Sequence, residues 1–143
     1  MKRILYSLAT ACLMAVLMTS CNMFTAPSFE EDLLIGKWQN TANSGEFWVY
    51  TTETTNDGEY QYGHTWDESY NDPEQAVYEE DLTPYGNGWF KWKLVKSSLT
   101  QIHLMENAGA EIPKVYTVTA LTETTLTYKD DFKKTYTFKK ISK

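Results

Sequence analysis

The fold class is decided by residues 88–95, which read Gly-Trp-Phe-Lys-Trp-Lys-Leu-Val. Within this stretch apolar side chains alternate with lysines: Phe90, Trp92 and Leu94 against Lys91 and Lys93. A period of two places the two sets on opposite faces of an extended strand. The stretch therefore predicts a β-strand with one face in a core and the other in water.

Short runs of the same kind follow one another from Gly36 to the end of the chain. They are rich in Thr, Tyr, Val, Trp and Phe and are separated by Gly, Asn, Asp and Pro, which is typical of an all-β domain. Tight turns are indicated by Asn56-Asp57-Gly58 and by Tyr85-Gly86-Asn87-Gly88. We predict eight strands, over residues 36–41, 46–53, 59–66, 88–95, 99–105, 114–121, 124–129 and 132–141.

Alternation predicts which strand faces are buried. In the later strands we expect inward-facing Ile102, Leu104, Leu126, Tyr128, Tyr136 and Phe138, with Gln101 and His103 facing outward. Eight such antiparallel strands can close into an up-and-down β-barrel, which removes the exposed edges of an open sheet. The interior of an eight-stranded barrel is just large enough to be filled by side chains or to hold one small ligand.

A short N-terminal helix is expected before the first strand. Ser28 and Glu31 have the spacing of a capping box ahead of the apolar residues 33–35, and Gly36 ends the helical pattern. We expect one or two helical turns there, and a barrel domain over residues 29–143.

Residues 1–20 have the pattern of an export signal. Lys2 and Arg3 precede an apolar run, Ile4 to Met18, that is too short for a membrane-spanning helix. Leu17-Met18-Thr19-Ser20-Cys21 resembles a bacterial lipobox, and this resemblance implies cleavage before Cys21 and lipidation of its sulfur.

The mature chain would then begin with a lipidated tether, residues 21–28, joined to the membrane through Cys21. Residues 8–12 also resemble a lipobox ending at Cys12, although the apolar stretch before it is much shorter. An ordinary cleaved signal would instead give a soluble secreted protein. The residues just after Cys21 lack an acidic cluster, which favours an anchor on the periplasmic face of the outer membrane.

Composition argues against several function classes. The chain has 13 basic and 19 acidic residues, and without Lys2 and Arg3 the net charge is −8 with no arginine. A nucleic-acid protein would need a basic face to neutralise phosphates. Both cysteines lie within or at the end of the expected signal, so we expect neither a disulfide nor a thiolate metal centre in the domain.

The longest connection, Asp67 to Pro84, has seven acidic residues among 18. It is predicted to be a long loop over one end of the sheet or a strand with an irregular edge. As a loop, it would be either a lid over a cavity or a solvated acidic surface.

The candidate ligand-binding residues are aromatic. Tyr60, Tyr62, His64 and Trp66 share one face of the third predicted strand, and if that face is inward they would join Phe90 and Trp92 in a cavity wall with polar groups. Alternatively, these side chains simply fill or close the barrel. Trp89 is expected outside, where it could stack on a sugar ring or on a partner.

No catalytic or metal-binding pattern is found. His64 and His103 lie on different predicted strands, and no calcium-loop spacing, serine elbow or glycine-rich phosphate loop is present. We therefore expect a protein without a cofactor or resident metal that is not an enzyme.

Gly36-Lys37-Trp38, after a short helix and at the head of the first strand, resembles the start of the lipocalin barrel. The three final strands, from Tyr116 to Lys140, resemble the terminal hairpins of lipocalin-like lipoproteins of Bacteroides-type bacteria. This resemblance implies a lipocalin-like (calycin) barrel in which Gly36 and Trp38 close one end. Lipocalins usually stack an arginine on this tryptophan; here Lys139 or Lys140 would take its place.

The expected function is binding of a small hydrophobic or amphipathic molecule inside a membrane-anchored barrel. The main alternative is a packed barrel that binds or inhibits a protein of the cell envelope, with Asp67 to Pro84 as its contact surface. A third is a glycan-binding surface lipoprotein that uses Trp89.

Overall fold

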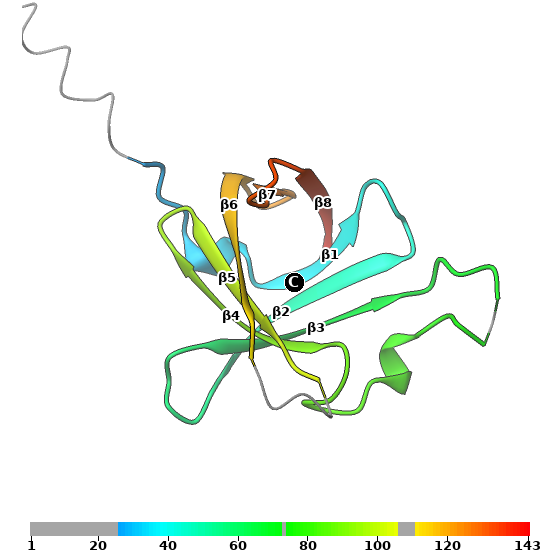
Figure 1. Ribbon diagram of the computed structural model, residues 1–143. Coiled ribbons are helices and arrows are strands. Elements are labelled where there is room, and N and C mark those ends of the chain that lie inside the picture. Colours follow the sequence, from blue (N-terminus) through cyan, green and yellow to red (C-terminus); the bar gives the residue numbers. More distant parts are fainter. Residues whose placement is uncertain (1–25, 73, 106–110) are drawn as a thin grey trace, which may run out of the picture.

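The computed structural model describes residues 26–72, 74–105 and 111–143. The expected signal peptide, Cys12 and Cys21 lie outside the described residues. Eight antiparallel strands form a closed ring in which each strand pairs with its neighbours along the chain and β8 pairs with β1 (Figure 1). The prediction of an all-β, eight-stranded, antiparallel up-and-down barrel is confirmed.

Every predicted strand is present, with ends displaced by three residues or fewer. The largest displacement is at the start of β8, because the Asp130 carboxylate accepts hydrogen bonds from the backbone N–H groups of Phe132 and Lys134 and holds these residues in a turn. The strands are β1 (Gly36–Asn40), β2 (Glu46–Thr54), β3 (Gln61–Asp67), β4 (Trp89–Val95), β5 (Ser98–His103), β6 (Pro113–Leu121), β7 (Thr125–Lys129) and β8 (Thr135–Ser142).

The expected N-terminal helix is not formed. In its place lies a single 3-10 turn, η1 (Glu31–Leu33), whose N-cap position is Glu30 and which has no side-chain cap. The backbone N–H of Phe29 donates to the carbonyl of Lys96 (3.2 Å), so the residues before η1 run extended along the β4–β5 turn. The capping-box prediction from Ser28 was wrong because this tertiary contact fixes the backbone.

Large aromatic side chains fill the barrel interior. Tyr50 packs edge-on against both Phe90 and Trp92, with ring centroids 5.5 and 5.3 Å apart. Across the barrel Phe138 lies 5.3 Å from Tyr128. All five side chains are buried. The inward face predicted for β4, β7 and β8 is the face observed.

The predicted faces of β5 are reversed. Gln101 pairs with Trp92 and is fully buried inside the barrel, where its amide donates to the Tyr50 hydroxyl (2.8 Å). Ile102 pairs with Lys91 on the outer face. The reversal follows from Leu99, which faces Leu94 at the start of the strand and so puts every second residue, including Gln101 and His103, inside.

Trp38 is fully buried near the end of the barrel where the chain enters β1, called here the closed end. Its indole N–H donates to the Leu34 carbonyl (2.7 Å), and the Lys140 ammonium lies 4.7 Å from the centre of its ring. Lys140 also donates to the carbonyls of Leu33 and Ile35, both at 2.7 Å. Gly36, at φ +128°, brings the backbone so close to Ser142 that a Cβ would lie 2.6 Å from its carbonyl oxygen.

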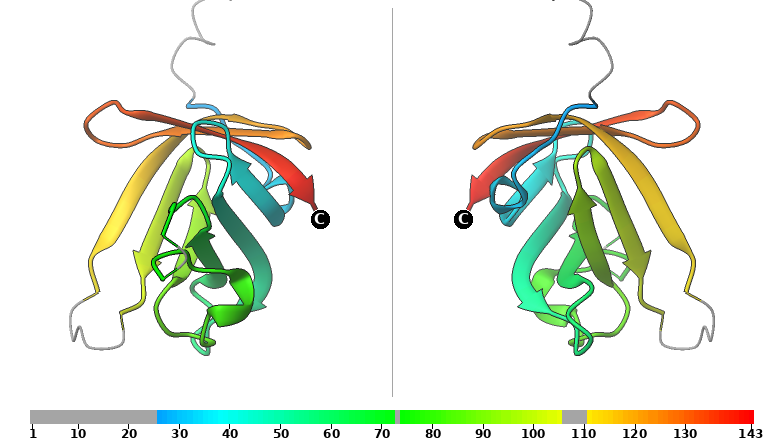
Figure 2. Two further views of the ribbon diagram at one scale, coloured as in Figure 1. Left: turned by 90° about the vertical axis from the view of Figure 1, so that its right-hand side faces the viewer. Right: turned by 90° about the vertical axis from the view of Figure 1, so that its left-hand side faces the viewer.

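The opposite end, called here the open end, carries the connections β1–β2, β3–β4, β5–β6 and β7–β8. The connection from β3 to β4, residues 68–88, is called the β3–β4 segment. Its described residues, 68–72 and 74–88, include one 3-10 turn, η2 (Glu79–Asp81). In the view toward the open end this segment, in green, lies in front of the strands (Figure 2, left).

Candidate ligand-binding site at the open end

The register of β3 decides where its aromatic residues point. Gly63 pairs with Tyr50 on one side and with Phe90 on the other, and a Cβ on Gly63 would lie 2.5 Å from the Phe90 ring. Gly63 therefore faces the crowded interior. The alternating residues Tyr62, His64 and Trp66 face outward.

The six candidate residues are thus divided between two environments. Phe90 and Trp92 lie inside the barrel and are fully buried. Tyr60 lies outside, with the Lys93 ammonium 4.4 Å from the centre of its ring. The inward wall envisaged for Tyr60, Tyr62, His64 and Trp66 is not formed, because the interior volume beside β3 is taken by rings from β2 and β4, and only a small side chain fits at Gly63.

The outward aromatic residues form a second cluster on the barrel wall. The Trp66 ring stacks on Phe47 (5.2 Å) and on His64 (5.8 Å), and His64 contacts Trp89 (5.1 Å). Beyond them the Tyr85 ring lies 4.9 Å from Trp89. Trp66 is only 4% exposed, so this cluster is a small core between the barrel and the β3–β4 segment.

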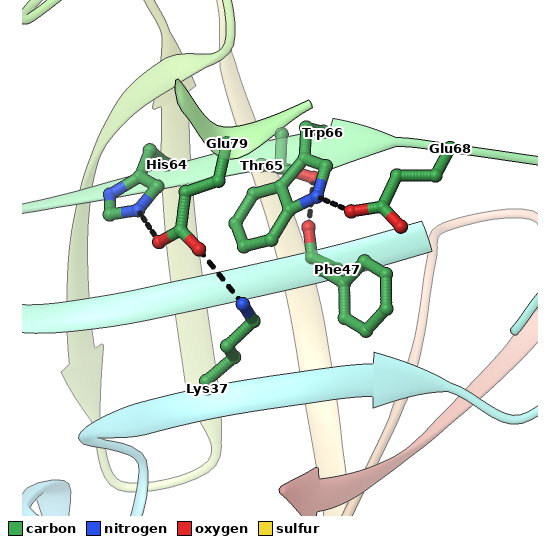
Figure 3. Close-up of polar contacts among 7 residues, drawn as sticks. All are labelled: Lys37, Phe47, His64, Thr65, Trp66, Glu68 and Glu79. Carbon is green, nitrogen blue, oxygen red and sulfur yellow. Dashed lines mark hydrogen bonds and ion pairs between the residues drawn. The ribbon is translucent and has the colours of Figure 1, made fainter. Parts of the chain in front are cut away.

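Polar contacts fasten the β3–β4 segment to this wall (Figure 3). The Glu79 carboxylate in η2 accepts from the Lys37 ammonium (2.8 Å) and lies 3.1 Å from His64 Nε2. The indole N–H of Trp66 donates to Glu68 (2.7 Å). Partial burial would raise the pKa of Glu79, but the hydrogen bonds from Lys37 and His64 outweigh it and lower that pKa.

Backbone contacts hold the segment against β3 at its end and near its middle. The N–H of Thr65 donates to the carbonyl of Gly88 (2.7 Å), and the N–H of Val77 donates to the carbonyl of Asp67 (3.1 Å). Gly88 has φ +87°, and a Cβ there would lie 2.8 Å from both the Thr65 carbonyl and the Leu82 side chain. A glycine is required at this position for the segment to approach β3 so closely.

A hollow of about 390 Å³ lies between the barrel rim and the β3–β4 segment. It is at the open end, because β2 begins, β3 ends and β4 begins there. Most of its lining is apolar. The residues that line it are Glu46, Thr65, Trp66, Asp67, Tyr70, Val77, Leu82, Asn87 and Gly88.

Two carboxylates border this hollow. Glu46 and Asp67 pair across β2 and β3 at the barrel rim. Glu46 accepts from the Trp48 indole (2.6 Å) and the Asn40 amide (2.7 Å). Asp67 accepts from the Asn43 amide (2.9 Å) and the backbone N–H of Ser69 (2.8 Å). Both carboxylates are therefore fixed in position by neutral donors.

Polar groups continue from the rim into the barrel. His103 packs flat on Phe90 (5.3 Å) and edge-on to Trp48 (5.6 Å), and its Nε2 lies 3.5 Å from Gln101 Oε1. Burial, with a smaller contribution from Lys114, lowers the pKa of His103 to about 4, so the imidazole is neutral near pH 7. Burial also raises the pKa of the Tyr50 hydroxyl, which stays protonated.

Two further hollows of about 340 Å³ flank the same rim. One lies between the β1–β2 and β7–β8 turns and includes Glu46 and Tyr136. The other lies beside β6 and includes Tyr116 and Tyr136. Burial raises the pKa of Tyr116 to about 12. The concave surface of the open end therefore extends around the rim from Glu46 to Tyr116.

The aromatic alternation of β3 did not identify Glu46, Val77, Leu82 or Gly88 as lining residues. The sequence feature that pointed to this region was the unusual length of the connection from Asp67 to Pro84. Among the described residues no group of three or more His, Cys, Asp or Glu side chains is arranged to hold a metal ion. Along the same parts of the chain, no helix has the length and apolar character needed to cross a membrane.

Comparison of the chain with models of protein families, with curated proteins and with solved structures finds no match.

Proposed function

We propose that this protein is a non-enzymatic binding protein of the cell envelope that holds a small amphipathic molecule at the open end of a lipocalin-like barrel. Lipidation of Cys21 would anchor it to the membrane, with the outer membrane and its periplasmic face as the proposed location. The sequence resemblance to lipocalin-like lipoproteins supports both the anchor and the family.

The observation that carries the binding proposal is the 390 Å³ hollow beneath the β3–β4 segment. Its size falls within the range of small-molecule sites, and it combines apolar walls with a few polar groups. Trp66, Val77 and Leu82 offer apolar contact, and Glu46 and Asp67 offer fixed polar atoms at the rim. This combination suits a molecule with one apolar and one polar part.

The deep interior supports a ligand less well than the open end does. Four large aromatic side chains are buried there and fill the space that a ligand would need: Trp38, Phe90, Trp92 and Phe138. We therefore place the ligand at the rim, with its apolar part under the β3–β4 segment, rather than in the middle of the barrel.

Filling the hollow tests this proposal. Val77→Trp puts a large side chain where the apolar part of the ligand would lie, and Val95→Trp is the matched control on an exposed residue at the closed end. Binding of an apolar fluorescent dye, and retention of any natural ligand in native mass spectrometry, should be lost in Val77→Trp alone. Equal binding by both variants and the unchanged protein would contradict the proposal.

A second candidate function is a packed barrel that binds another envelope protein. It is favoured by exposed apolar residues on the open-end connections: Phe132 is 92% exposed, Ile112 75% and Met105 68%. If this candidate is correct, a partner should co-purify with the unchanged protein and be lost on Phe132→Ser, while Val77→Trp leaves it bound. A glycan-binding role for Trp89 is a weaker candidate, because Trp89 is half-buried under Tyr85.

A further inference from the structure

We propose that the open-end hollow is selective for an amphipathic molecule with a positively charged head group, such as an alkylammonium. This inference rests on the proposed function, since it names the chemical class of ligand for the same site. We draw it from the charged side chains around the hollow and from the groups that already form hydrogen bonds or ion pairs with them.

The first argument is that the two rim carboxylates have no cationic partner among the described residues. Glu46 is held by Trp48 and Asn40, and Asp67 by Asn43 and Ser69, all of which are neutral donors. The ion pairs among the described residues involve Glu79, Glu111 and Glu59 instead. The two negative charges at the hollow are therefore positioned but not neutralised.

The second argument is the charge of the chain that builds the site. Between Trp38 and Phe90 there are eleven acidic residues and no lysine or arginine. This stretch supplies every described residue that lines the hollow. Fields from charges at a partly enclosed site add together, so the hollow attracts cations and repels anions.

The third argument concerns two lysines beside the site: Lys37, which lies over the Trp66 ring, and Lys134, which lines a neighbouring hollow together with Glu46. The Lys37 ammonium pairs with Glu79 at 2.8 Å and lies 4.3 Å from the centre of the Trp66 ring, on the outer wall. Lys134, across the rim, lies 4.9 Å from the centre of the Tyr136 ring. Neither lysine forms a described ion pair with Glu46 or Asp67.

The walls of the hollow also suit such a ligand. An alkyl chain would be buried against Val77 and Leu82, and the aromatic rings of Trp66 and Tyr70 border the same space. The Trp66 ring already has the Lys37 ammonium over it, so the ring that can attract a ligand cation is that of Tyr70, which is 53% exposed. An aromatic ring gives no such advantage to an anionic head group. Carboxylates and aromatic rings together therefore favour an ammonium over a neutral or anionic head.

The decisive experiment compares three ligands that share an octyl chain and carry a positive, a neutral or a negative head group. Octyltrimethylammonium, octyl glucoside and octyl sulfate, each below its critical micelle concentration, are titrated into the purified protein by calorimetry. We expect the ammonium to bind about tenfold more tightly than the glucoside and the sulfate to bind weakest. High salt should weaken only the ammonium.

Two charge-neutralising variants test whether the rim carboxylates cause the preference for the ammonium. Glu46→Gln and Asp67→Asn should each reduce the preference for the ammonium over the glucoside several-fold. Glu123→Gln, an exposed residue in the β6–β7 turn at the closed end, is the matched control and should leave that preference unchanged. The comparison of head groups on the unchanged protein does not depend on whether either rim variant folds.

The outcomes separate this inference from the proposed function. If none of the three amphiphiles binds in competition with the dye, the binding site itself is refuted. If all three bind with equal affinity, or if the sulfate binds best, the site stands and its cationic selectivity is overturned. A preference for the ammonium that both rim variants retain in full would also overturn the assignment to Glu46 and Asp67.

Discussion

The same eight strands form both ends of this barrel, but the two ends differ in how the chain covers them. At the closed end an indole is buried under the chain, its N–H is paired with Leu34, and a lysine caps its ring. At the open end the strands lead into a long acidic segment that leaves a hollow of about 390 Å³ against the rim. The closed end also has hollows, of about 350 Å³ beside Gly36 and about 140 Å³ beside Lys140. What distinguishes the two ends is that the chain covers its own tryptophan at the closed end, whereas the hollow at the open end lies against an acidic segment.

This difference separates residues that stabilise the fold from residues available for binding. Trp38 and Lys140 each make several contacts within the protein, so changing them should cost stability. Val77 is 40% exposed and borders the hollow, so changing it should alter binding with little cost to the fold. The predictions below test this separation, from the largest expected effect to the smallest.

Removal of the closing indole should have the largest effect. Trp38→Ala leaves a cavity beside Leu34 and should lower the free energy of unfolding by about 3 to 5 kcal/mol, as for other buried aromatic residues. Urea unfolding followed by circular dichroism measures this. Val77→Ala, at the open end, should cost about 0.5 kcal/mol or less; similar losses from both variants would remove the distinction between the two ends.

The pH dependence of stability should report the partly buried histidine at the open end, His103. The pKa of His103 is about 4 in the folded protein and about 6.5 when unfolded, so below pH 6.5 the unfolded chain binds the proton more readily. Stability should therefore fall by about 2 kcal/mol as the pH drops from 6.5 to 4, after allowance for partial solvent exposure.

His103→Gln is the control for this titration, because it keeps a polar side chain beside Gln101 without a group that titrates in this range. The variant should lose most of the slope between pH 6.5 and 4. The lowered pKa of Glu79 also makes stability fall with acidity, but only near and below its ordinary value of 4.5. An unchanged slope in His103→Gln would show that other groups dominate the titration.

The lysine at the closed end should contribute less than the indole it covers. Lys140→Met keeps the aliphatic stem but removes two hydrogen bonds and the cation–π contact with Trp38, and should cost about 1 to 2 kcal/mol. Lys140→Arg retains a cation and should recover part of the loss. Thermal unfolding measures both, and equal stability of the methionine variant and the unchanged protein would argue against a role for Lys140 in closure.

The smallest effect is expected at Ser28. A serine that caps a helix contributes about 1 kcal/mol, but η1 has no side-chain cap and begins after Glu30. Ser28→Ala should therefore change the free energy of unfolding by about 0.5 kcal/mol or less. A loss near 1 kcal/mol would show that Ser28 does cap this turn in solution.

The faces of most strands could be predicted because their alternation is unambiguous. On β4, apolar Phe90 and Trp92 alternate with lysines, and water competes strongly for the charged side chains. On β3 and β5 both alternating sets contain groups that can be buried, such as Gly63 and Trp66 or Gln101 and Ile102. The local pattern left the face of β3 open and gave the wrong face for β5, and pairing with the adjacent strands settled which residues face inward.

The candidate site was harder to predict because its residues come from separate stretches. Glu46 begins β2, Asp67 ends β3, and Val77 and Leu82 lie in the β3–β4 segment. None of them belongs to a short motif. Only the register between β2 and β3, and the close approach of Gly88 to Thr65, bring them around one hollow.

The sequence by itself determined the number and order of strands, the turn positions, the excess of acid from Trp38 to Phe90 and the tryptophan at the head of β1. These features depend on period and composition, which act over a few neighbouring residues. Tertiary structure decided which face of β3 is inside, the replacement of the helix by a 3-10 turn, and the position of the hollow. Each of these depends on contacts between residues distant in sequence, because a closed barrel has limited interior volume and the packing of all its strands decides which side chains occupy it.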